Sequence, residues 1–147
     1  MLQRFPYESS ENRAINNEEI ESIVMRAMFE KAYDLIAETQ KDEEMTYRMN
    51  LFDFIQPEHL EIDSSLLNSE NLAKVQTQVS KINSLKAPKD KLIAIVNSCK
   101  LISALIKMEQ PEESGKELGA DEFLPVLIYC ILKAKPKSPI SDIIYIK

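Results

Sequence analysis

Residues 88–108 read PKDKLIAIVNSCKLISALIKM, and their apolar side chains recur at three- and four-residue steps. This period is that of an amphipathic α-helix. Pro88 suits the first helical position, because a proline there removes an N–H that would have no partner in any case. The apolar stripe is wide enough for a central helix and is expected to consist of Leu92, Ile95, Val96, Cys99, Ile102, Leu105 and Ile106.

Two helices are expected in the N-terminal part of the chain. Asn16 can cap a helix over about residues 17–40, with Glu19 where a capping box places an acid. The buried stripe of this helix is expected to be Ile20, Ile23, Val24, Ala27 and Met28, continued by Lys31, Leu35 and Ile36. The second helix begins at the solvated acids of residues 42–44, which complement its dipole, and ends before Pro57. It is expected to bury Met45, Met49, Phe52 and Ile55.

The remaining patterns are helical as well. A third helix begins at Asn68 or Ser69, with the apolar stripe Leu72, Val75, Val79, Ile82 and Leu85. Both glycines of the chain lie in the surface loop 109–119. A fifth helix is expected from Pro125 to about residue 135, buried on most of its circumference, and a last one over Ser141–Ile146. The predicted fold class is therefore all-α, a layered helical domain.

Composition excludes several classes of protein. With two glycines in 147 residues, the chain lacks the glycine-rich loops of Rossmann and P-loop enzymes. The net charge of −6 argues against a nucleic-acid binder. The longest apolar run, 123–132, is about half of a bilayer span, and residues 1–10 have no apolar signal core. We therefore expect a cytoplasmic protein that does not insert into membranes.

The residues that could carry chemistry are few. Cys99 and Cys130 have neither the spacing nor the histidines of a zinc site, and two buried thiols are expected. The single histidine, His59, is expected to be partly buried and bonded to backbone. The acids of residues 42–44 lack the spacing of a calcium loop. We expect no metal and no cofactor, and a hydrolytic or metal enzyme has only His59 and scattered acids in its favour.

Asp121 is open to two interpretations. It lies just before the predicted helix start at Pro125 and next to the glycine-containing loop. It is either an N-cap, worth about 1 kcal/mol, or a carboxylate displayed to a partner at the edge of a loop. From the residues alone the cap is favoured, because caps are common and displayed acids are not.

Four motifs resemble the vacuolar-protein-sorting-nine domain family. They are GADEFLPVLIY at 119–129 with KAKP at 133–136, SDIIYI at 141–146, FIQPEHLEI at 54–62, and INSLKAPKDKL at 82–92. The resemblance covers about residues 50–147. Residues 16–49 resemble the helical-bundle portion that precedes the domain in this family, and residues 1–15 are expected to be a flexible leading segment.

The resemblance implies a guanine-nucleotide exchange factor for small Rab GTPases of the early endosome, chiefly the Rab-five group. Asp121 would be the family's aspartate finger, which pairs with the phosphate-loop lysine of the GTPase and competes with magnesium. Pro125 would fix the start of the finger's helix. Leu124, Leu127 and Tyr129 would contact the GTPase as well. Recruitment to early endosomes would be peripheral.

The resemblance also implies a departure from the family pattern at the C-terminus. Members continue past the motif at 141–146 into further helices whose Tyr and Thr face the GTPase, so this chain is expected to lack the last helices of the domain. The alternative is therefore a helical scaffold that binds a Rab or another partner without promoting exchange.

Overall fold

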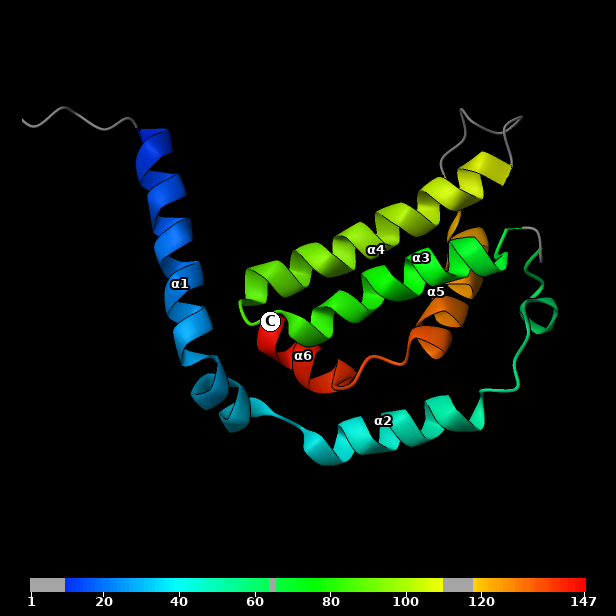
Figure 1. The fold of residues 1–147 in the computed structure, drawn as a ribbon, viewed down its shortest axis with the longest axis horizontal. Helices are drawn as coiled ribbons and strands as arrows, with labels where there is room; N and C mark the ends of the chain where they lie inside the picture. The colour runs from blue at the N-terminus through cyan, green and yellow to red at the C-terminus, as the bar shows by residue number, and fades with distance from the viewer. Residues whose placement is uncertain (1–9, 64–65, 110–117) are drawn as a thin grey trace, which may run out of the picture.

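The computed structural model describes residues 10–63, 66–109 and 118–147, and over these ranges the chain forms helices and no strand (Figure 1). The α-helices are α1 (Ser10–Ile36), α2 (Thr39–Leu51), α3 (Ser69–Ser80), α4 (Pro88–Glu109), α5 (Ala120–Ala134) and α6 (Pro139–Ile146). Two short 3-10 helices, η1 (Pro57–Leu60) and η2 (Lys81–Ser84), follow α2 and α3. The predicted all-α class is confirmed. None of the helices in these ranges has both the length and the apolar content that crossing a bilayer requires.

The helices α3, α4 and α5 pack against one another and enclose the hydrophobic core (Figure 1). Helix α6 packs on α4, α2 runs along α6, and α1 lies at one edge in contact with α4 and α6. The buried core side chains are Ile62, Leu66, Leu67, Val75, Ile102, Leu105, Ile106, Val126, Tyr129 and Cys130. The three central helices and the connector before α3 therefore form the hydrophobic core.

Helix α3 follows the prediction closely. The Asn68 side chain caps it by accepting the backbone N–H of Asn71 at 2.9 Å. Val75 and Ile82 are buried, and Leu72 and Val79 pack partly buried against the core. After Ser80 the helix tightens into η2, so the single helix expected up to Leu85 is an α-helix followed by a 3-10 turn.

Helix α1 differs from its prediction in both its start and its inward face. It begins at Ser10, so residues 10–15, expected to be flexible, are helical. The predicted buried stripe points outward: Ile20, Ile23, Val24, Met28 and Leu35 are all exposed. The inward face instead carries the half-buried Met25, Phe29 and Tyr33. Phe29 and Tyr33 face inward, in place of the predicted stripe, because they have specific partners on α4 and α6.

Those partners surround Lys91, a lysine that is only 2% exposed. Its ammonium donates to Asp142 Oδ1 at 2.7 Å and to the Ile82 carbonyl at 2.8 Å. It also lies 5.6 Å from the Phe29 ring centroid and 5.7 Å from that of Tyr33. Two hydrogen bonds, a counter-ion and two aromatic faces together make burial of this charge possible.

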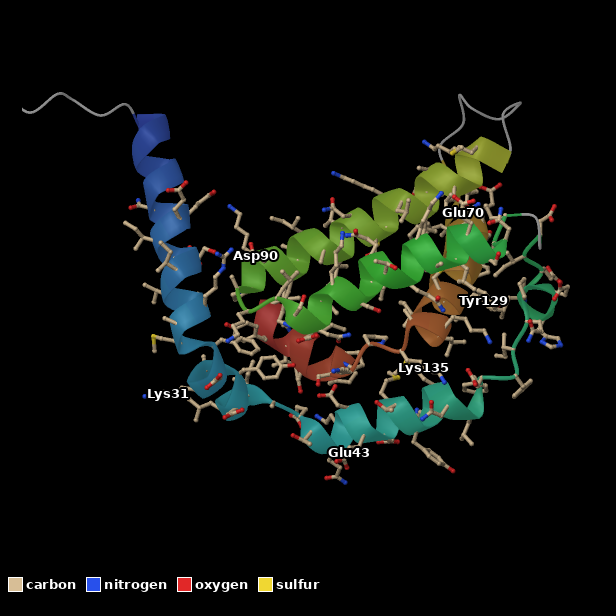
Figure 2. All side chains as sticks on the ribbon, in the orientation of Figure 1. Lys31, Glu43, Glu70, Asp90, Tyr129 and Lys135 are labelled. Atoms are coloured by element: carbon tan, nitrogen blue, oxygen red, sulfur yellow. The ribbon has the colours of Figure 1, made fainter. Side chains whose placement is uncertain are left out.

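The burial of Lys91 sets the rotation of α4. Its buried face carries Lys91, Ala94, Ser98, Ile102, Leu105 and Ile106, while Leu92 and Val96, predicted to be buried, are exposed. Near α1, the carboxylate of Asp90 pairs with the Arg26 guanidinium at 2.7 Å, and Figure 2 shows Asp90 in the space between the two helices. Charged groups of α1 and α4 therefore meet at this contact.

Helix α2 is tied to α6 by a buried acid. Asp42, expected to be solvated, is buried and accepts the Ile140 N–H at 2.8 Å and the Ser141 N–H at 3.3 Å. The Ser141 hydroxyl also donates to it and accepts the Glu38 N–H at 2.8 Å. Asp42 thus caps α6 from another helix.

The apolar prediction for α2 is half right. Met49 is buried and Ile55, beyond the helix end at Leu51, is half-buried, whereas Met45 and Phe52 are exposed. Asp42 occupies the contact with α6 and so decides which face of α2 turns inward.

Candidate functional site

The N-terminus of α5 begins earlier than the sequence predicted. Gly119 is the N-cap residue and the helix runs from Ala120, so Asp121 is its second residue and Pro125 lies inside it. Two interpretations are corrected by this register: Asp121 is not the N-cap, and Pro125 does not occupy the first position. The Gly119 carbonyl accepts the N–H groups of Glu122 at 3.3 Å and Phe123 at 3.1 Å.

Pro125 has a local effect on Asp121. In an α-helix the N–H of residue 125 would bond to the carbonyl of residue 121, and proline has no such N–H. The Asp121 carbonyl therefore lacks the backbone N–H that an α-helix would otherwise donate to it from residue 125. Pro125 and Asp121 also line the same cleft.

This cleft has a volume of about 310 Å³ and separates the start of α5 from the connector that follows η1. Asp121 is exposed at its rim, and Val126 and Pro125 form the α5 side. The full lining is Leu60, Glu61, Ile62, Asp63, Leu66, Ile106, Asp121, Glu122, Pro125 and Val126. The floor is apolar and the rim carries carboxylates.

The connector side of the cleft is held by short-range bonds. His59 Nδ1 accepts the Gln56 N–H at 3.0 Å, and Glu61, at φ 56°, takes the left-handed conformation that turns the chain into the core residue Ile62. The predicted backbone bond of His59 is therefore present, although the ring is exposed.

The other end of α5 is joined to the segment between α2 and η1. The Lys133 ammonium donates to the Asp53 carbonyl at 2.7 Å, and Lys135 pairs with the Asp53 carboxylate at 3.1 Å. The Lys135 ammonium lowers the pKa of the exposed Asp53 carboxyl. Figure 2 shows Lys135 where the chain leaves α5, above α2. The C-terminal end of α5 is thus anchored to the segment before η1.

The cleft has an excess of negative charge. Four of its lining side chains are carboxylates, Glu61, Asp63, Asp121 and Glu122, and none of the described residues that line it is Lys or Arg. The N-terminal end of α5 stabilises anions within its first turn. An ammonium or a divalent cation is the complementary ligand for such a surface.

The other predicted contact residues lie elsewhere on α5. Leu124 is 48% exposed and does not line the cleft. Leu127 is half-buried and lines a second, apolar cavity of about 180 Å³ between α3, α4, α5 and α6. Tyr129, labelled on α5 in Figure 2, is 4% exposed and belongs to the core. Lys133 Nζ lies 5.5 Å from its ring centroid. The structure brings Asp121 and Pro125 together and keeps Tyr129 away from the surface.

The two thiols differ in environment. Cys130 is fully buried, as predicted, and burial raises its pKa to about 12. Cys99, which was also predicted to be buried, is only half-buried, because it lines the apolar cavity. Both cysteines are free.

Two features of the site are missed by the sequence patterns. One is the wall made by residues 60–63, which the motif at 54–62 signals only as apolar anchors. The other is Glu122, whose Oε2 accepts the Gly119 N–H at 3.1 Å. The signal for it was present: an acid three residues after a residue that can be an N-cap.

Comparison with known proteins identifies relatives along most of the chain. The family model of the vacuolar sorting protein 9 (VPS9) domain matches residues 72–147. "Vacuolar protein sorting-associated protein 9A" of Oryza sativa subsp. japonica is 38% identical over 141 residues, covering 95% of this chain and 29% of the relative. "Rab5 GDP/GTP exchange factor" of Bos taurus is 28% identical over 134 residues, covering 88% of this chain and 26% of the relative.

A third relative extends the same result. "Vacuolar protein sorting-associated protein 9A" of Arabidopsis thaliana is 38% identical over 130 residues, covering 87% of this chain and 25% of the relative. The chain thus spans less than a third of the length of each of these three curated relatives.

Proposed function

This chain belongs to the vacuolar sorting protein 9 (VPS9) domain family, and from that premise we propose that it is a guanine-nucleotide exchange module for a small Rab GTPase. The Rab-five group is the proposed partner, because one relative is named as an exchange factor for Rab5. The proposed place of action is the early endosome, reached by recruitment to the membrane surface. One observation carries the proposal: Asp121 is an exposed carboxylate at the rim of an acidic cleft.

The proposed mechanism needs no covalent step. A GTPase holds GDP through Mg²⁺ and a lysine ammonium on the phosphates. The Asp121 carboxylate enters the nucleotide site, pairs with that lysine in place of phosphate and repels or displaces the metal ion. The nucleotide-free GTPase is stabilised and GDP leaves faster. The neighbouring carboxylate of Glu61 adds to the attraction for the lysine.

Apolar residues of α5 supply the proposed docking contacts. Leu124 and Ile128 are 48% and 49% exposed and lie one turn apart on α5, so one side of the helix offers them to a partner. Leu127 lines the adjoining apolar cavity. Pro125 is assigned to shaping the helix around Asp121, and Tyr129 to packing beneath it.

The test is release of fluorescent GDP from a panel of Rab GTPases, with the chain added in catalytic amounts. The chain is expected to accelerate release from a Rab-five-group member, and Asp121→Ala is expected to abolish the acceleration. The matched control is Glu70→Ala, because Glu70 is also an exposed acid at the second position of a helix, α3. That variant is expected to keep the full rate.

Two results would contradict the proposal. If the GTPase releases GDP as fast with Asp121→Ala as with the unaltered chain, the finger assignment is wrong. If the chain binds the GTPase saturably and release does not change, the domain acts as a scaffold, the alternative stated above.

A further inference from the structure

The first turn of α5 contains two neighbouring acids that do different things. Glu122 is half-buried, and its Oε2 accepts the Gly119 N–H at 3.1 Å. Asp121 is exposed, and within the described residues no hydrogen bond or ion pair engages its carboxylate. One acid closes the helix end, and the other is left available.

A competing register would reverse this division of roles. Aspartate is among the strongest N-cap residues. If α5 began at Glu122, Asp121 would be the N-cap, and its carboxylate would accept the N–H of Phe123 or Leu124. A carboxylate that caps its own helix is turned toward the N–H groups of that helix, which takes it away from a partner's lysine. The register of α5 therefore decides whether Asp121 is available.

Backbone bonds support the observed register, because the N–H groups of Glu122 and Phe123 donate to the Gly119 carbonyl. The N-cap residue Gly119 has no side chain to accept a hydrogen bond. In the competing register the first helical bond would run from residue 125 to the Asp121 carbonyl, and Pro125 has no N–H to make it. The bond from the Gly119 N–H to the Glu122 carboxylate is the side-chain interaction that adds to these backbone terms, because it closes on Gly119 and not on a later residue.

We propose that Glu122 is a positioning residue that keeps Asp121 free for the GTPase by holding α5 in its observed register. The inference rests on the exchange function proposed above and adds a residue to it. Glu122 acts through backbone geometry and does not need to touch the partner. Its amide analogue should therefore do the same work, because glutamine accepts the same N–H in a capping box.

The test compares Glu122→Ala with Glu122→Gln in the full chain, by two measurements. Amide hydrogen exchange by NMR reports protection of the Gly119 N–H, and fluorescent-GDP release reports function. Glu122→Ala is expected to lose the protection and to slow release about fivefold, the equivalent of about 1 kcal/mol for a cap. The maximal rate of GDP release should fall, and the GTPase concentration that gives half of the maximal rate should stay the same. Glu122→Gln is expected to keep both, as is the control Glu70→Ala.

The outcomes separate this inference from the function it rests on. Unchanged Gly119 protection in Glu122→Ala, or a full release rate, overturns the positioning role while the exchange function stands. Equal slowing by Ala and Gln assigns Glu122 to the charge of the cleft and also overturns it. If the unaltered chain does not accelerate GDP release from the GTPase, the exchange function is refuted, and the positioning role with it.

Discussion

Replacing Lys91 with methionine tests the centre of the fold. The substitution removes an ammonium that is 2% exposed and leaves the Asp142 carboxylate, itself almost fully buried, without its counter-ion. Tyr33 still donates to that carboxylate at 2.8 Å, but it brings no charge. Removing one partner of a buried ion pair costs about 3–5 kcal/mol. The free energy of unfolding of a domain is about 5–15 kcal/mol, so Lys91→Met should be marginally stable.

The assay is urea unfolding followed by circular dichroism, supported by thermal melts. The loss corresponds to a fall in melting temperature of about 6–20 °C for a chain of this length. Lys89→Met is the matched control, because Lys89 is on the same helix and pairs with Glu18 at the surface. An exposed pair contributes about 0–1 kcal/mol.

A second variant distinguishes a lost charge partner from a packing defect. In Lys91→Met with Asp142→Leu, neither charge remains to be buried, and most of the stability should return. If Lys91→Met costs less than about 1 kcal/mol, or if the double variant is as unstable as the single one, Lys91 is not buried against Asp142 and the account of the α4 rotation is wrong.

The other predictions concern the start of α5 and the two thiols. Gly119 has φ −71° and ψ 156°, and a Cβ there would meet only Glu122 Oε2 at 3.7 Å, so Gly119→Ser should add a capping hydroxyl and stabilise the chain by a few tenths of a kcal/mol in urea unfolding; a destabilised variant would contradict this. Iodoacetamide at pH 8 should label Cys99 faster than Cys130, as measured by mass spectrometry, and equal rates would contradict the burial of Cys130. Burial raises the pKa of Cys130 from 9.0 to about 12, and the unfolded chain therefore loses its thiol proton first. This contribution to stability is complete below pH 9 and is lost as the pH rises toward 12, so the urea midpoint should fall over that range and not rise.

The helices themselves were largely predictable, and their inward faces less so. The stripe on α3 was correct because its apolar residues form one set with polar residues opposite. In α1 the apolar residues form two sets, one around Ile23 and Val24 and the other around Phe29 and Tyr33. Periodicity cannot rank two such faces. The choice depends on Lys91, which is far away in the sequence.

Buried charge explains the same failure in α4 and α2. Lysine and aspartate are expected at the surface, because burying an unpaired charge is costly. Lys91 and Asp42 are buried because their partners come from segments about 50 and 100 residues away, Asp142 and the start of α6. No local sequence pattern shows such a pairing. A prediction from the apolar period alone therefore assigns the wrong face of the helix to the core.

The candidate site shows how a motif and its geometry carry different information. Asp121 was singled out by its place before the predicted helix and given its role by the resemblance, and the structure puts it on the rim of a cleft with Pro125. The helix start was misassigned because a proline usually marks the first turn. Here the helix begins at Ala120, five residues before Pro125, and the bond between Gly119 and Glu122 closes its end. That difference has a functional consequence. A helix that began at Pro125 would leave Asp121 in the preceding loop, with its carboxylate unrestrained. In the observed register Asp121 belongs to a helix anchored at both ends, so little ordering of its backbone should remain to be done when it meets a partner.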